Sequence, residues 1–322
     1  MNGFLLTILR KVAFFIAVLM GVSFFIIALS RAVPGDAIDQ ITDSPEQREQ
    51  LEAELGLDRP VLAQYGHWWL RMLALDLGES WVIRQGERVS TLIGPAAIKT
   101  ARLVLPALFL TFALSTLLIA LFRFDGLTFL KGALRSSAHM VSVIPLFLLG
   151  YLLIMAFNVP TYRLVEQGVI DRPLWFALPA EETWLKYILA VLVLALGNGT
   201  LSDVLLHLEA EVDQLIRQEF MVSTRARGGS TLRHFIPNIL MPIMTIFVNK
   251  AGFFLGGVVV VEYVFNINGL GMMIWNAANQ RDVPVVIAIT FLIAALVASL
   301  NLLNDLLQVL VDPRARQTEA AP

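Results

Sequence analysis

The chain contains no cysteine and few charged residues, and both shortages restrict what it can be. Without cysteine, neither a disulfide framework nor a thiolate metal site is possible. Charged residues make up 16% of the 322 residues, against about 25% in an average soluble domain. Hydrophobic residues make up 57%. This composition is typical of an integral membrane protein.

Motifs that carry chemistry are also missing. The four histidines are scattered without the spacing of metal ligands, and no nucleophile and base are arranged for catalysis. No glycine-rich G-x-x-x-x-G-K-[S/T] loop is present to cradle nucleotide phosphates. We therefore expect a protein that is not an enzyme and has no metal or cofactor of its own. Energy for any transport would come from another subunit or from an ion gradient.

Six apolar runs approach or exceed the length that crosses a membrane as a helix, which is about 20 residues. They are Val12–Ser30, Leu103–Phe122, Met140–Phe157, Tyr187–Leu201, Phe235–Val261 and Val283–Asn304. The first is not a cleaved signal peptide by its pattern, because Arg31 and Pro34 follow it in place of a small-residue cleavage site. The expected fold is an all-α integral membrane protein with six transmembrane helices.

Lysine and arginine are distributed unevenly between these runs. With the N-terminus inside, eleven lie in cytoplasmic segments and four in the two short outside loops. The eleven are Arg10, Lys11, Arg123, Lys131, Arg135, Arg217, Arg225, Arg227, Arg233, Arg314 and Arg316, and the four are Arg163, Arg172, Lys186 and Arg281. Because positive charge favours the cytoplasmic side, both termini are expected in the cytoplasm.

Four parts follow along the chain. Residues 1–30 form the N-terminal tail and first helix, 31–102 a periplasmic segment, 103–311 the transmembrane core and 312–322 a cytoplasmic tail. In the periplasmic segment, Glu46–Leu57 predicts a short polar helix. Val61–Leu75 carries Tyr65, Trp68 and Trp69, a stripe that favours a helix lying at the membrane surface.

A polar, basic stretch between the fourth and fifth runs, Phe220 to Pro242, is typical of a docking element. It lies in the cytoplasmic loop 203–237. Glycine permits a positive φ between two helices, and Ser230 stands where the second helix needs a capping hydroxyl. Arginines give directed contacts to a partner's carboxylates. The simpler alternative is a basic loop that only sets topology. Before it, Asp203–Phe220 predicts an acidic amphipathic helix, with either a solvated face or a partner contact.

Lys250 is the one charge within the fifth run. A charge at this depth costs about 2.5–3.5 kcal/mol on insertion scales, so such residues face a bundle interior or a water-filled cavity. Lys250 would either line a translocation path and favour a substrate carboxylate, or pair structurally with a carboxylate on another helix or on a partner permease.

Several motifs, in the same order and at similar spacing, resemble the membrane-spanning permease subunits of bacterial ABC importers for dipeptides, oligopeptides and nickel. They cover nearly the whole chain. The matching segments are Pro34-Gly35-Asp36, Leu55–Pro60, Asp76–Ser80, Arg225–Gly228, Val259–Gly271, Asn279–Val286 and Asp312–Arg314.

The resemblance implies roles for two sets of residues. The basic stretch would be the coupling helix between the fourth and fifth spans that docks on an ATPase subunit. Its residues are Thr224, Arg225, Arg227, Gly228, Gly229, Ser230, Leu232 and Pro242. Gly229 departs from the family, which usually has a larger residue there. The second set would form the periplasmic gate and binding-protein contact, or simply pack to close the outer end of the bundle. It contains Glu262, Phe265, Gly269, Gly271, Arg281 and Asp282.

The resemblance also implies partners and a mechanism. They are a second homologous permease, two ATP-binding subunits that hold ATP and Mg, a periplasmic solute-binding protein and the lipid bilayer of the inner membrane, with no nucleic acid. Transport would be by alternating access of peptides or a similar small solute. A gradient-driven secondary transporter or channel is the alternative, although no internal repeat is evident. A non-transporting membrane scaffold is a third hypothesis.

Overall fold

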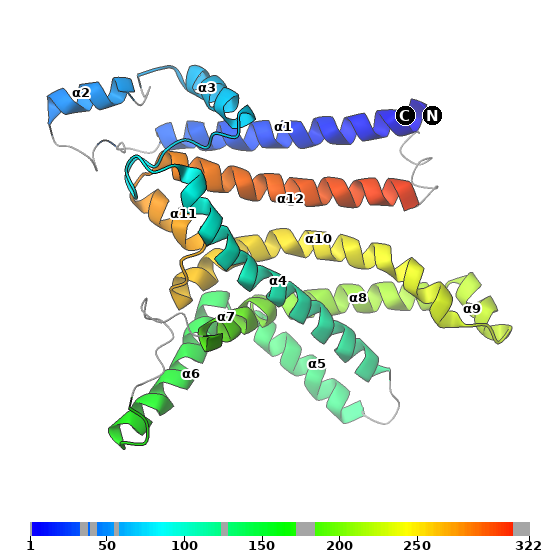
Figure 1. The fold of residues 1–322 in the computed structure, drawn as a ribbon. Coiled ribbons are helices and arrows are strands. Elements are labelled where there is room, and N and C mark those ends of the chain that lie inside the picture. Colours follow the sequence, from blue (N-terminus) through cyan, green and yellow to red (C-terminus); the bar gives the residue numbers. More distant parts are fainter. Residues whose placement is uncertain are drawn as a thin grey trace. The chain divides into compact units, whose positions relative to one another are not determined.

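The computed structural model of the chain describes residues 2–32, 38, 44–54, 58–123, 128–171 and 184–311. Within these ranges the secondary structure is helical (Figure 1). The helices are α1 (Asn2–Ala32), α2 (Pro45–Glu54), α3 (Val61–Leu73), α4 (Val89–Phe122), α5 (Thr128–Val143), α6 (Leu146–Glu166), α7 (Trp184–Leu196), α8 (Thr200–Ile216), α9 (Glu219–Ala226), α10 (Thr231–Phe265), α11 (Leu270–Asn279) and α12 (Val283–Val311). Predictions for Pro34, Gly35, Asp36, Leu55, Gly56, Leu57, Arg172, Asp312, Arg314, Arg316 and the tail 312–322 lie outside the described residues.

The all-α membrane class is confirmed. Five helices, α1, α4, α6, α10 and α12, are long and apolar enough to cross a membrane. The pair formed by α7 and α8, which is bent by 51°, makes a sixth span if it counts as one. Each predicted apolar run therefore falls on one of these helices. The short helices α2 and α3 also lie where the sequence pattern placed them.

Several helix boundaries differ from the sequence-based expectation, and three of these differences bear on the fold. The third span begins at Leu146 instead of Met140, because Pro145 has no N–H to donate and disfavours helix in the residue before it. The fourth run breaks after Leu196, where Asn198 and Gly199 have φ of 51° and 79°. The predicted acidic helix is thus the second half of a bent pair. Helix α4 begins at Val89, within the segment that was expected to be periplasmic.

The chain forms two compact units. Unit 1 comprises Met1–Lys99 and Asn268–Pro322, and unit 2 comprises Thr100–Ile267, so the boundary falls within α4. In unit 1, α1 lies alongside α12 (Figure 1). Helix α3 contacts both: the Tyr65 hydroxyl donates to the Met20 carbonyl at 2.9 Å, and the Trp68 ring lies 5.2 Å from that of Phe291. The aromatic stripe predicted for α3 thus packs on two membrane helices.

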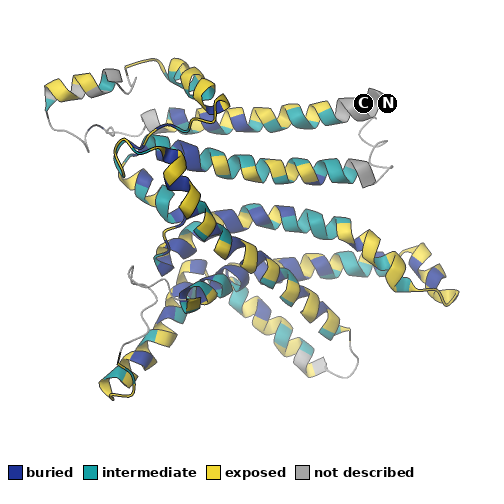
Figure 2. Ribbon diagram, viewed as in Figure 1, coloured by how far each residue is buried: buried dark blue, intermediate teal, exposed yellow. Residues whose placement is uncertain are grey.

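In unit 2, α10 packs against α6, α7 and α8. Its buried residues lie mainly toward its C-terminal half, as the dark blue segments of α10 show (Figure 2). Glycine allows close approach here, because a Cβ at Gly150 of α6 would lie 2.9 Å from a methyl of Val264. Large apolar side chains are exposed along α1, α4 and α6, as expected for helices that face lipid.

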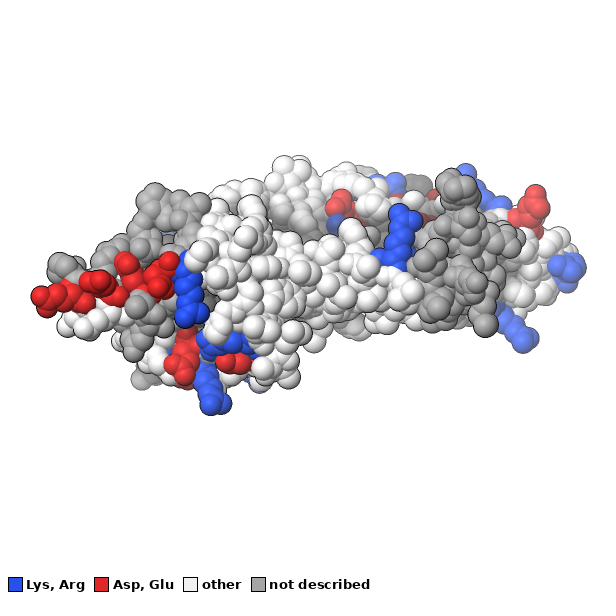
Figure 3. Space-filling view, turned by 90° about the horizontal axis from the view of Figure 1, so that it is seen from above, with Lys and Arg blue, Asp and Glu red and all other residues white. Residues whose placement is uncertain are grey.

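Charged side chains avoid the apolar parts of these helices. In the face shown in Figure 3, the acidic atoms at the left end lie over α2, and a wide part of the surface carries neither sign. Such a surface fits a chain whose middle is in contact with hydrocarbon.

Candidate functional site

The glycine turn, residues 224–231, joins α9 to α10. Helix α9 ends with Gly228 in the left-handed region at φ 67°. The Gly228 N–H donates to the Arg225 carbonyl at 3.1 Å, and the Gly229 N–H donates to the Thr224 carbonyl at 3.0 Å. These two bonds make a complete Schellman motif, which satisfies the last carbonyls of a helix. The predicted positive φ at the turn glycine is confirmed.

Ser230 lies at the N-cap of α10 as expected, with φ −68° and ψ 102°, but its hydroxyl makes no capping hydrogen bond. The capping prediction was therefore right in position and wrong in contact. Backbone hydrogen bonds alone define the turn.

Gly229 fits closely against α9. A Cβ at this position would lie 3.0 Å from Thr224 Cγ2 and 3.3 Å from the Thr224 carbonyl oxygen. Thr224 is buried, and its hydroxyl donates to the Phe220 carbonyl at 2.7 Å. The second glycine thus permits a tight closure that a larger residue would obstruct, which gives a physical reason for its departure from the family pattern.

The outward surface of this turn is basic and apolar. Arg225, Arg227 and Arg233 are exposed. The Arg227 guanidinium folds back to donate to the Ser223 carbonyl at 3.2 Å. Leu232, Ile236 and Val222 are more than half exposed. A convex surface of this composition can contact a partner through both apolar burial and ion pairing.

The acidic residues of α8 are not simply solvated. Three carboxylates of α8 each contact a cation from a different segment of unit 2. The pairs are Asp203 with Lys250 of α10, Glu209 with Arg135 of α5, and Asp213 with Arg123. Neither a solvated face nor an external partner is needed to explain them.

Lys250 is therefore paired within the chain. Its ammonium lies 2.8 Å from Asp203 Oδ2 and 5.2 Å from the ring centre of Phe253. Of the two roles that the sequence left open, the structure supplies the carboxylate on another helix that the structural role requires.

The residues predicted for the outer gate fall into two groups. Glu262 and Phe265 end α10 in unit 2, where both are fully buried, and the Thr100 hydroxyl donates to Glu262. Gly269, Gly271, Arg281 and Asp282 lie in unit 1, on or beside α11. Arg281 is only half-buried, whereas Asp282 is fully buried.

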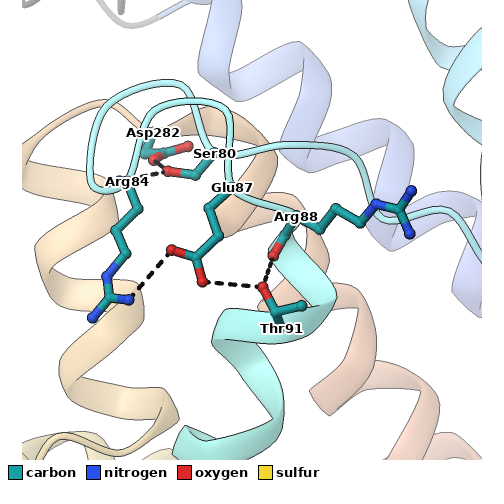
Figure 4. Close-up of polar contacts among 6 residues, drawn as sticks. All are labelled: Ser80, Arg84, Glu87, Arg88, Thr91 and Asp282. Atoms are coloured by element: carbon teal, nitrogen blue, oxygen red, sulfur yellow. Dashed lines mark hydrogen bonds and ion pairs between the residues drawn. The ribbon is translucent and has the colours of Figure 1, made fainter.

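The buried carboxylate of Asp282 organises a loop far away in the sequence, residues 76–88, here named the Asp282 loop. It accepts hydrogen bonds from the Ser80 hydroxyl and from the N–H groups of Trp81, Val82 and Ile83, the last three at 3.0–3.1 Å. Ser80 Oγ in turn accepts from the Arg84 N–H at 3.0 Å (Figure 4). Asp282 also bridges the end of α11 and the start of α12 through its backbone.

Charged side chains complete the same loop. Arg84 pairs with Glu87 at 3.3 Å, and Thr91 donates to Glu87 at 3.2 Å (Figure 4). Asp76 accepts from Arg71 Nε at 2.8 Å and from the Gly78 N–H at 3.0 Å. The Arg71 hydrogen bond, followed by that of Gly78, holds the pKa of Asp76 below its ordinary value.

Lys186 does not lie in a loop, as the sequence predicts, but in a helix. It lies in the first turn of α7, is 1% exposed, and donates to the Asn266 carbonyl at 2.7 Å. Asn266 is the left-handed C-cap of α10, where a cation is favourable. The fourth apolar run begins at Tyr187 because a run without charges excludes the lysine, whereas α7 begins at Trp184.

A metal centre is not evident in the part of the chain that the structure describes, where no three His, Asp or Glu side chains come together to hold an ion. The described residues do form an exposed basic and apolar turn and a set of internal ion pairs.

Comparison with known proteins identifies a family and several relatives that this chain resembles. Residues 114–317 match the model of a family described as binding-protein-dependent transport system inner membrane component. A probable peptide ABC transporter permease protein (y4tP) of Sinorhizobium fredii is 31% identical, over 96% of this chain and 98% of the relative. The oligopeptide transport system permease protein AppB of Bacillus subtilis is 31% identical over 95% and 98%. A putative peptide permease protein of Brucella suis is 28% identical over 96% and 98%.

Such permeases are transport subunits that work with ATP-binding and substrate-binding components, and the ATPase activity resides in the separate ATP-binding components. The match covers well over half of the chain and includes the glycine turn and all of α10 to α12. The chain therefore belongs to the family of inner membrane components of binding-protein-dependent transport systems, as a multi-pass permease subunit of an ABC importer.

Proposed function

We propose that the chain forms one half of the translocation path of an importer for peptides or a similar small solute. The other half would be a second, homologous permease. Two ATP-binding subunits would hold ATP and Mg, and a periplasmic binding protein would deliver the solute. The printed names of the relatives, which include peptide and oligopeptide transport, support this solute class. The lysine and arginine distribution supports cytoplasmic termini.

The observation that carries the proposal is the glycine turn. It closes by backbone bonds alone, so its exposed arginines and apolar side chains remain available to a cleft on an ATP-binding subunit. Thr224, Gly228 and Gly229 would shape the turn, and Arg225, Arg227 and Leu232 would contact the partner. Ser230 would start α10, and Pro242 within α10 removes one helical hydrogen bond.

Closure of the ATP-binding subunits would displace this turn, and α8 and α10 would carry the displacement into the membrane. Two arrangements of the helices, open to opposite sides, would then exchange as in alternating access. The rival hypothesis of a gradient-driven transporter gains no support from the family match.

At the outer end, Glu262 and Asp282 are buried, so we propose that they hold the loops that meet the binding protein. Phe265, Gly269 and Gly271 would pack these loops, and the half-buried Arg281 would lie nearer the contact. The alternative to the Asp203 pair, a Lys250 that lines the path, predicts that Lys250→Gln changes substrate preference, in competition uptake assays, while leaving the assembled complex intact.

Affinity purification of the tagged chain from its native membrane in mild detergent tests the coupling role. Gly228→Asp should lose the co-purifying ATP-binding subunits, because an aspartate there strains the turn and repels their carboxylates. Gly168→Asp is the matched control, since Gly168 also has positive φ, at 69°, and open space around it, but follows α6. Equal recovery of the ATP-binding subunits with both variants would contradict the assignment.

A further inference from the structure

The helices α7 and α8 form a bent pair with a break between them. The two helices meet at 51°, and the residues between them, Gly197, Asn198 and Gly199, include two in the left-handed region. Glycine reaches this region without steric cost, so the break is a natural place for a change in backbone angle.

Asp203 lies in the first turn after this break. Its N–H donates to the Gly199 carbonyl at 2.8 Å, and its carboxylate pairs with Lys250 at 2.8 Å. The Lys250 side chain is 14% exposed, and that of Asp203 is 56% exposed. The ion pair thus joins α8 to α10 immediately beside the break.

The same two helices are joined a second time, at the glycine turn. With a rise of about 1.5 Å per residue, Asp203 lies about 20 Å from the end of α8, and Lys250 about 28 Å from the start of α10. Helix α9 connects the other ends. Between these two points α8 and α10 also pack on each other, in the apolar cluster that holds Leu205 and Leu208. The ion pair and the turn therefore lie at the two ends of a packed helix pair.

Breaking this pair would be costly chiefly for Lys250, because its side chain is the most buried of the three cations that pair with α8, whereas Asp203 is more than half exposed. Removing one partner leaves the other as an uncompensated charge, and intramembrane charges seldom remain unpaired. The other two ion pairs of α8 lie nearer the turn, and their arginines are more than 40% exposed. Exposed pairs contribute little.

We propose that Lys250 and Asp203 are positioning residues that pin α8 to α10 beside the break. When the glycine turn is displaced, α8 then rotates about Gly197–Gly199, and α10 moves with it. Without the pin, α8 bends away from α10 and the displacement is lost before it reaches the rest of unit 2. The proposal rests on the coupling role proposed above for the turn.

The test uses the complete transporter in lipid nanodiscs, with its partner subunits and binding protein. Because this chain has no cysteine, Leu206→Cys on α8 and Leu240→Cys on α10 introduce two labelling sites on exposed positions. Pulsed electron spin resonance then measures the distance between spin labels in the nucleotide-free and ATP-trapped states. Stimulation of ATP hydrolysis by the binding protein is measured in parallel.

With the native pair we expect a narrow distance distribution that is the same in both states. Lys250→Gln and Asp203→Asn should broaden it in the ATP-trapped state and reduce the stimulation several-fold. Exchange of the two charges, Lys250→Asp with Asp203→Lys, should restore both readouts. Arg135→Gln, which breaks an exposed pair on the same helix, is the control and should leave the distribution narrow.

Two results would overturn the pin. One is an unchanged distribution and stimulation in both single variants. The other is loss of stimulation in the single variants with a narrow distribution and no recovery on charge exchange, which would assign Lys250 to the substrate instead. Failure of the coupling role itself gives a different result. In the purification described above, Gly228→Asp would then recover as much of the ATP-binding subunits as the native chain does.

Discussion

The Asp282 loop and the glycine turn both connect helices, and both contain glycines of positive φ, yet they are held in opposite ways. In the Asp282 loop a buried carboxylate accepts four hydrogen bonds from residues about 200 positions away. In the glycine turn the hydrogen bonds of the Schellman motif run between backbone groups within six residues.

The two kinds of hydrogen bonding indicate different functions for the two regions. A loop whose polar groups are satisfied by one buried side chain has a fixed position in its own unit, and that side chain is not available to a partner. A turn closed by its backbone has a fixed shape, and the side chains of residues 225–230 stay exposed. We therefore interpret Asp282 as an internal organiser and the arginines of the turn as contact residues.

The largest effect should come from Asp282→Ala. It leaves three partly buried N–H groups and the buried Ser80 hydroxyl without their acceptor. An unsatisfied group costs about 1–3 kcal/mol when fully buried, and less when partly exposed. We expect the thermal unfolding midpoint of the purified chain in detergent to fall strongly, with Ser80→Ala giving a smaller fall. Asp171→Ala, at an exposed position, is the control. Equal midpoints for Asp282→Ala and Asp171→Ala would show that the carboxylate does not hold the loop.

Gly228→Ala should have a smaller effect on stability and a selective effect on coupling. A Cβ in the left-handed region costs about 1–2 kcal/mol. Gly168→Ala should cost about the same, because its φ is nearly equal and its surroundings are equally open. Binding-protein-stimulated ATP hydrolysis in the reconstituted complex should fall only for Gly228→Ala. A parallel fall in both would mean that the turn matters only for folding.

Gly229 gives a finer test of the turn. Gly229→Leu restores the larger residue of the family pattern, but its Cβ would meet the Thr224 methyl group at 3.0 Å. We expect a modest loss of stimulated ATP hydrolysis. Thr224→Ser removes that methyl group, keeps the hydroxyl that donates to Phe220, and should recover part of the loss in the double variant. Activity of Gly229→Leu equal to that of the native chain would show that the close contact is not needed.

The two regions also differ in how far sequence could predict them. The glycine turn is local: the positive φ of Gly228 and the N-cap position of Ser230 follow from neighbouring residues and are found as expected, whereas the capping contact of Ser230 is not. The contact of Ser80 with Asp282 spans 202 positions, and no local pattern signals it, although both residues stood in motifs that resemble the family.

Apolar runs indicated which segments cross the membrane but not where each helix begins. Lys99 and Arg102 seemed to precede the second span, yet α4 starts at Val89, because charged residues are compatible with helix wherever they are not in hydrocarbon. The same criterion left Lys186 out of α7. The ion pairs of α8 depend on tertiary contacts among four segments, so periodicity could show only that the helix was acidic and amphipathic.

The smallest effect concerns Asp76, a carboxylate of the Asp282 loop that is half exposed. Its pKa is lower in the folded loop than in the unfolded chain, first because of the Arg71 hydrogen bond. Its contribution to stability is therefore present above the ordinary aspartate pKa and is lost as the pH falls through the lowered value. Arg71→Gln should raise the pKa and move this loss to higher pH. Hydrogen exchange of residues 74–89, compared between the native chain and Arg71→Gln at each pH, measures the shift. If the two chains give the same dependence of protection on pH, the low pKa is due to the Gly78 N–H. A large loss of protection with Arg71→Gln at neutral pH would contradict the view that Asp282, rather than Asp76, holds the loop.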